Sequence, residues 1–143
     1  RTRRELNATV RRELADPERL LPGLATDTQG PLWYRGLAEG EPGELESHLR
    51  GVLRFHGVRR IVIGHTVTRT AILPRFESRV VNIDLGLSRF YGRPPACLIM
   101  EGASVYVIHR GTKISLPGSG KVELADYLMA VQPREQQPSS SAA

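Results

Sequence analysis

Residues 58–68 read VRRIVIGHTVT, and in them an apolar run (IVI, 61–63) ends at a Gly-His-Thr sequence (64–66). A short continuous apolar run is typical of a β-strand that is covered on both faces, so we expect a buried strand at 61–63. Open α/β sheets bind ligands beyond the carboxyl ends of their strands, where His65 would project. Its imidazole could bind a metal there, or it could only form a hydrogen bond within a turn.

The flanking segments predict helices and further strands, which together form part of an α/β layered sheet. Leucine and valine recur at helical spacing before Gly57, a suitable helix stop, and before the Asp16-Pro17 break near the N-terminus. Two apolar runs around Glu101-Gly102-Ala103 are typical of a hairpin. The expected helices span 2–15 and 43–56, and the expected strands span 61–63, 79–83, 96–100, 104–109 and 113–116.

Composition is that of a globular protein. The 143 residues are 40% hydrophobic and 24% charged, which excludes wholesale disorder. No apolar run approaches the ~20 residues that cross a bilayer, so we expect no membrane partner. Cys97 is the single cysteine, which excludes an internal disulfide and a multi-cysteine zinc site. The presence of a single cysteine favours a reducing compartment, so we expect a cytoplasmic protein.

Positive charge is concentrated in the middle of the chain. The net charge is +5, and residues 47–115 hold eleven basic against three acidic side chains. Most are arginines, which suit bidentate recognition of phosphate or carboxylate. They do not form a basic stripe with interleaved aromatic residues, so we expect no nucleic-acid partner.

Two further side chains are candidates for a functional site, each with two interpretations. Asp84 follows an apolar strand; it could orient a metal-bound histidine through the second ring nitrogen, or cap the turn that follows. Arg35 follows Trp33 and Tyr34 in a loop rich in glycine and proline; it could bind a phosphate, or be an exposed loop arginine. Loops seldom carry such large aromatic side chains unless these dock on something.

Other residues of catalytic type give weaker signals. His48 and His56 are eight residues apart on the expected helix, which does not suit a shared metal, and His109 ends a strand. The PGSGK sequence at 117–121 departs from a phosphate-binding loop in its first glycine and in its final Ser/Thr. Cys97 lies in an apolar run, and we expect it to be a core residue rather than a nucleophile.

Four segments in order resemble bacterial-type serine/threonine protein phosphatases of the calcineurin-like metallophosphoesterase superfamily. They are GPLWYRGL (30–37), VRRIVIGHTVT (58–68), VVNIDLGLSRFYG (80–92) and ACLIMEGASVYVI (96–108), and the resemblance covers about residues 30–111. It implies hydrolysis of phosphate monoesters at two divalent metal ions, often manganese or iron. It also implies that the partner is a phosphorylated protein or small molecule.

Within this resemblance, His65 matches a ligand of the second metal, Arg35 matches a phosphate-contacting arginine, and Asp84 matches a supporting aspartate. Val67 stands where other branches of the superfamily have a second metal-binding histidine, a departure that favours the protein-phosphatase branch.

The family's GDxHG, GDxxDRG and GNHE motifs are absent, as is a VHGG-like strand end. We therefore expect the chain to be the C-terminal half of a layered metallophosphoesterase β-sandwich flanked by helices, inactive by itself. In this interpretation residues 1–117 belong to the catalytic domain, 118–131 form an extension and 132–143 a disordered tail. The alternative is a non-catalytic module that binds an acidic or phosphorylated partner through its arginines.

Overall fold

The computed structural model describes residues 2–16, 22–68, 71–88, 90, 95–102, 104–118 and 121–132. The chain divides into two compact units, residues 1–40 and 41–143. All but one residue of the tail expected at 132–143 lies outside the described residues. In the described part, no helix has the length and apolar character needed to cross a membrane.

The first unit contains helices α1 (Arg3–Leu14) and α2 (Gly36–Glu39). A capping box begins α1: Thr2 Oγ1 accepts from the Glu5 backbone N–H, and the Glu5 carboxylate accepts from the Thr2 N–H. The helix expected over 2–15 is confirmed. The one-turn helix α2 was not expected, since four residues are too few to show a helical period.

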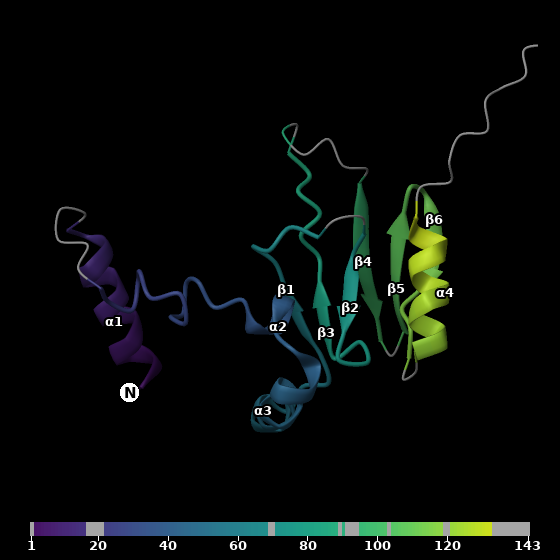
Figure 1. Ribbon diagram of the computed structural model, residues 1–143. Coiled ribbons are helices and arrows are strands. Elements are labelled where there is room, and N and C mark those ends of the chain that lie inside the picture. The colour runs from purple at the N-terminus through teal and green to yellow at the C-terminus, as the bar shows by residue number, and fades with distance from the viewer. Residues whose placement is uncertain are drawn as a thin grey trace, which may run out of the picture. The chain divides into compact units, whose positions relative to one another are not determined.

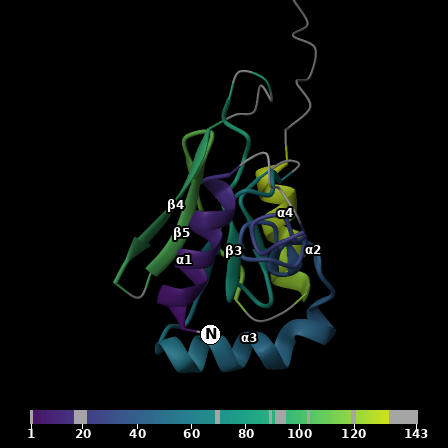
Figure 2. The same cartoon turned by 90° about the vertical axis from the view of Figure 1, so that its left-hand side faces the viewer.

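The second unit begins with helix α3 (Pro42–His56), which confirms the helix expected at 43–56. Gly57 ends it in the left-handed region (φ 62°), where glycine pays no Cβ penalty. Leu49 and Leu53 are its buried residues, and Figure 2 shows α3 running crosswise to strand β3.

Three short strands form the first sheet: β1 (Ile61–Ile63), β2 (Leu73–Arg75) and β3 (Val80–Asn82). Their order is β1-β3-β2, with β1 parallel and β2 antiparallel to β3 (Figure 1). The expected strand 61–63 is therefore confirmed, but the prediction that it is covered on both faces is wrong. β1 lies at the sheet edge and Val62 is 38% exposed, whereas Val80 and Val81 of the central strand are fully buried.

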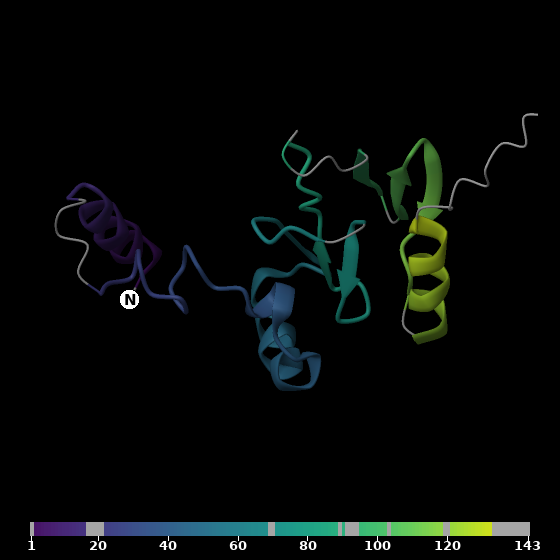
Figure 3. The same ribbon diagram turned by 45° about the horizontal axis from the view of Figure 1, so that its top comes forward.

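The second sheet is antiparallel, with the order β4-β5-β6: β4 (Ala96–Glu101), β5 (Ser104–His109) and β6 (Thr112–Ser115). The expected hairpin and last strand are confirmed. Helix α4 (Lys121–Val131) lies beside this sheet (Figure 3). The architecture is thus mixed α/β with two small sheets.

One hydrophobic core joins both sheets to α4. The Tyr127 hydroxyl donates to the carbonyl oxygen of Ile72 at 2.7 Å, which fixes α4 against the segment before β2. The core continues past residue 117, because α4 contributes two of its buried side chains. The buried members are Ala71, Ile72, Val81, Leu85, Val107, Tyr127 and Val131.

His109, at the end of β5, is 3% exposed. Burial, together with the positive charge of Arg110, lowers the pKa of the imidazole, so the folded chain takes up this proton at a lower pH than the unfolded chain does. The unfolded chain takes up this proton at about pH 6.5 and then binds more protons than the folded state. We therefore expect the free energy of unfolding to fall as the pH is lowered through about 6.5.

Urea unfolding at a series of pH values from about 8 to about 5.5 measures this change in the free energy of unfolding, because a histidine titrates in roughly this range. His109→Gln should flatten the pH dependence, while the exposed His48→Gln should leave it as in the wild type. An unchanged pH dependence in His109→Gln would show that another group is responsible.

Candidate functional site

The Gly64-His65-Thr66 turn directly follows β1. Because β1 and β3 are parallel, with Ile63 opposite Asn82, the carboxyl-terminal ends of the two strands lie side by side. His65 is exposed there and adopts a left-handed backbone conformation (φ 63°). This conformation is uncommon outside glycine and persists where the surroundings hold it, often at functional sites.

The turn is held by the end of β3. The Asn82 side chain is 2% exposed; its Nδ2 donates to the Thr66 carbonyl oxygen at 2.8 Å, and its Oδ1 accepts from the Asp84 N–H at 3.1 Å. Thr68 donates twice to the Asp84 carbonyl oxygen, from its N–H at 2.7 Å and from Oγ1 at 3.1 Å. The segment that ends β3, sixteen residues further along the chain, thus fixes the backbone that follows His65.

Asp84 is half-buried, and its Oδ1 accepts from the Gly86 N–H at 3.0 Å. This is an Asx turn, and it matches the turn-capping interpretation of Asp84. Its carbonyl oxygen also holds Thr68, so Asp84 acts on the His65 turn through its backbone. The predicted contact of its carboxylate with a metal-bound histidine stays a prediction.

Arg35 belongs to the first unit and is half-buried. Its Nη1 lies 3.4 Å from the Tyr34 carbonyl oxygen, and its Cζ lies 5.9 Å from the centre of the Trp33 ring. The Trp33 Nε1–H donates to the Ala25 carbonyl oxygen at 2.8 Å, so the aromatic ring is docked on its own loop. A hollow of about 630 Å³ opens beside these residues; it is lined by Thr28, Gln29, Trp33, Arg35, Gly36, Glu39 and Gly40.

A metal centre needs several ligands at once. Among the residues that the structure describes, no group of three or more His, Cys, Asp and Glu side chains lies close enough to hold a metal ion. His65 is the one residue at the turn whose type and exposure suit a metal. The described residues alone therefore do not form a dinuclear site.

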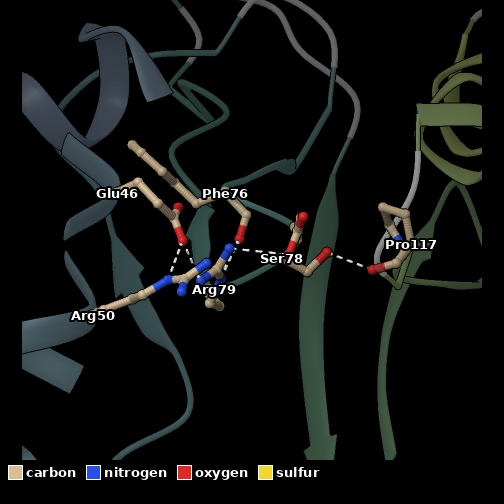
Figure 4. A network of polar contacts seen from close by, with 7 residues as sticks. Glu46, Arg50, Phe76, Ser78, Arg79 and Pro117 are labelled. Atoms are coloured by element: carbon tan, nitrogen blue, oxygen red, sulfur yellow. Dashed lines mark hydrogen bonds and ion pairs between the residues drawn. The ribbon is translucent and has the colours of Figure 1, made fainter. Parts of the chain in front are cut away.

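A polar network that the sequence did not reveal ties α3 to the turn between β2 and β3. Glu46 Oε1 accepts from Arg50 Nε and from Arg79 Nη1, both at 2.6 Å (Figure 4). The hydrogen bond from Arg50 lowers the pKa of Glu46, and Arg79 adds to this effect. A sequence signal exists only for the first pair, because Glu46 and Arg50 are four residues apart on a helix.

The same turn has an unusual backbone. Phe76, Glu77 and Ser78 all have positive φ values of 49° to 61°, and the Ser78 hydroxyl donates to the Pro117 carbonyl oxygen at 2.6 Å (Figure 4). A hollow of about 500 Å³ lies beside this turn. None of the residues around the His65 turn lines this hollow.

The comparisons with known proteins point to phosphatases. The chain is similar to three solved structures of a cold-active protein tyrosine phosphatase, one of them described as that of a psychrophilic Shewanella species. The TM-scores are 0.57 to 0.59 and the sequence identity is 26–27%. Each match covers 81% of this chain and 35% of the phosphatase.

The chain is also 34% identical over 92 residues to an uncharacterized protein of the fission yeast Schizosaccharomyces pombe. That match covers 62% of this chain and 28% of the yeast protein. No protein-family model matches the chain. The chain thus spans about a third of the relatives that it matches, and it resembles part of a phosphatase fold. This confirms the phosphatase resemblance at the level of structure.

Proposed function

We propose that the chain is part of a metal-dependent phosphoesterase that hydrolyses phosphate monoesters, with His65 as a ligand of a divalent metal and Arg35 as a phosphate contact. The observation that carries the proposal is the His65 turn. It presents an exposed imidazole at the carboxyl end of a parallel strand pair, in a chain that matches a phosphatase structure over 81% of its length.

Each named residue has a defined task. The Arg35 guanidinium would bind the phosphate oxygens through its paired N–H donors. Asn82 and Asp84 would keep the His65 backbone in place, through the four hydrogen bonds described above. The bound metal ions, manganese or iron, would supply Lewis-acid polarisation of the phosphoryl group. Their remaining ligands would come from outside the described residues.

The substrate would be a phosphorylated protein or small molecule. The sequence resemblance favours the serine/threonine branch, whereas the similar solved structures are of a tyrosine phosphatase. The proposed substrate class is therefore phosphate monoesters in general. We propose a cytoplasmic location, with neither nucleic acid nor membrane as a partner.

Hydrolysis of p-nitrophenyl phosphate tests the proposal. We expect the protein made from the complete natural reading frame to hydrolyse it when Mn²⁺ is present and to lose the activity with EDTA. The 143-residue chain by itself should be inactive, since its described residues hold no group of three ligands. Hydrolysis by the 143-residue chain would contradict the proposal that the remaining metal ligands come from outside the described residues.

The alternative is a binding module without catalysis, favoured by the positive charge of residues 47–115 and by Arg35 beside an open hollow. It predicts that a phosphopeptide binds the chain equally well with and without EDTA, and that the protein from the natural reading frame shows no phosphatase activity. Binding that requires metal would exclude this alternative.

A further inference from the structure

The hollow of about 500 Å³ in the second unit has the character of a ligand site. The start of α3, the turn between β2 and β3, and the start of α4 line it, and its volume is in the range of sites for small molecules. Neither Arg35 nor any residue of the His65 turn lines the hollow, so its use does not depend on the proposed phosphatase site. Its apolar lining consists of Pro42, Pro74, Phe76, Pro117 and Leu124.

The turn that forms one wall of the hollow is fixed in a strained conformation. Phe76, Glu77 and Ser78 follow one another with positive φ, which bulky side chains seldom adopt. Arg79 Nε donates to the Phe76 carbonyl oxygen, and Arg79 Nη2 pairs with the Glu77 carboxylate, both at 3.0 Å. Arg60 Nε donates to the Ser78 carbonyl oxygen at 2.6 Å. Strain that surrounding contacts hold in place is typical of ligand clamps, and a rigid wall loses little entropy when a ligand binds.

The charged groups of the hollow leave a positive side for a ligand. Arg79 pairs with both carboxylates of the lining, at 2.6 Å to Glu46 and at 3.0 Å to Glu77 (Figure 4). Arg50 also contacts Glu46 through Nε, but its side chain is 68% exposed. Arg75 places its Cζ 5.3 Å from the centre of the Phe76 ring. Three arginines against two glutamates give the lining one net positive charge.

We propose that this hollow binds a small carboxylate that carries an apolar group of about the size of a leucine side chain. The apolar group would pack on the prolines and Phe76, and the carboxylate would pair with Arg50 and Arg75. A carboxylate fits better than a phosphate, because the two glutamates repel the second negative charge of a phosphate. The same chemistry occurs in a free acid and at the C-terminus of a peptide that ends in an apolar residue.

A ligand series on the ¹⁵N-labelled 143-residue chain tests the proposal, read from the NMR shifts of the Gly43 and Gly118 amides, which line the hollow. We expect 4-methylpentanoate to bind about 3- to 10-fold more tightly than its uncharged amide. It should bind about 10-fold more tightly than acetate, which has no apolar group to bury, and more tightly than 3-methylbutyl phosphate. Acetyl-Gly-Gly-Leu separates the two sources: tighter binding than that of 4-methylpentanoate assigns the hollow to a peptide C-terminus, and weaker binding assigns it to a free acid.

Two glycines of α3 provide a blocking variant and its matched control. A Cβ atom at Gly43 or at Gly51 would meet no other atom within 4 Å, so a leucine at either position leaves the packing of the helix intact. Gly43 lines the hollow and Gly51 does not. Gly43→Leu should therefore weaken binding of 4-methylpentanoate by about 10-fold, read at the Gly118 amide, and Gly51→Leu should bind it as the wild type does.

A second pair of variants tests the charge. Arg50→Ala should weaken binding of 4-methylpentanoate about 3- to 10-fold and leave binding of its amide unchanged. Arg54→Ala removes the same charge one helical turn further along α3, from an exposed residue outside the hollow, and should change neither. Because the ligand series on the wild type carries the conclusion, a variant that fails to fold does not remove the test.

Four results would overturn the inference. Equal binding of 4-methylpentanoate and its amide would exclude recognition of the carboxylate, and tighter binding of 3-methylbutyl phosphate would favour a phosphate ester. Full binding in Gly43→Leu would place the ligand outside the hollow. No shift of either glycine amide at millimolar ligand would exclude the site. Each of these results would leave the proposed phosphatase function standing, because none of its residues lines the hollow.

Discussion

Leu85→Ala is expected to lower the free energy of unfolding by about 2–5 kcal/mol, the usual cost of removing a buried leucine and leaving a cavity. Leu85 is 2% exposed and belongs to the core that joins both sheets to α4. A change of this size is a large part of the stability of a domain.

Leu87 supplies the matched control, because it is 62% exposed and only two residues away. Leu87→Ala should change the free energy of unfolding by less than about 0.5 kcal/mol. Urea denaturation followed by circular dichroism measures both variants. Equal losses in the two would show that Leu85 does not lie in the core, and would argue against the packing described here.

Asn82→Ala is expected to release the His65 turn. It removes the donor to the Thr66 carbonyl oxygen and the acceptor of the Asp84 N–H, and leaving partly buried groups unpaired costs about 1–3 kcal/mol. The Thr68 amide, which donates to Asp84, should then exchange its hydrogen faster, while the amides of α3 keep their protection. Hydrogen-exchange mass spectrometry of the segment 58–68 measures this.

Two further variants sharpen the result. Asn82→Asp keeps an acceptor for the Asp84 N–H but has no donor for Thr66, so its turn should be less protected than in the wild type. Asn7→Ala changes the exposed asparagine of α1 and should have no effect on exchange at 58–68. Wild-type protection of Thr68 in Asn82→Ala would mean that the turn is held by other contacts.

The sequence was sufficient for elements whose side chains repeat regularly. The leucines of α3 recur at helical spacing, and the hairpin of β4 and β5 has two apolar runs around Gly102, so local pattern alone located them. The His65 turn was found for a similar reason, because a strand end followed by Gly-His-Thr is a local pattern.

Contacts between segments that are distant in the chain could not be predicted from the sequence. No strand was expected at 73–75; β2 contains Pro74 and lies at a sheet edge, where a missing N–H donor is tolerated. The edge position of β1 also depends on which strands pair, and a run of three apolar residues does not show this. Asn82 was not singled out, because its importance comes from Thr66, sixteen residues earlier in the chain.

The effect of His65 on metal-dependent activity tests the central claim most directly. In the protein made from the complete natural reading frame, His65→Ala should lower Mn²⁺-dependent hydrolysis of p-nitrophenyl phosphate by more than about 100-fold, since even the residues behind a metal ligand are worth 10- to 100-fold. It should also lower the bound metal content. His48→Ala, at an exposed histidine of α3, should leave both unchanged. Full activity and metal content in His65→Ala would contradict the account.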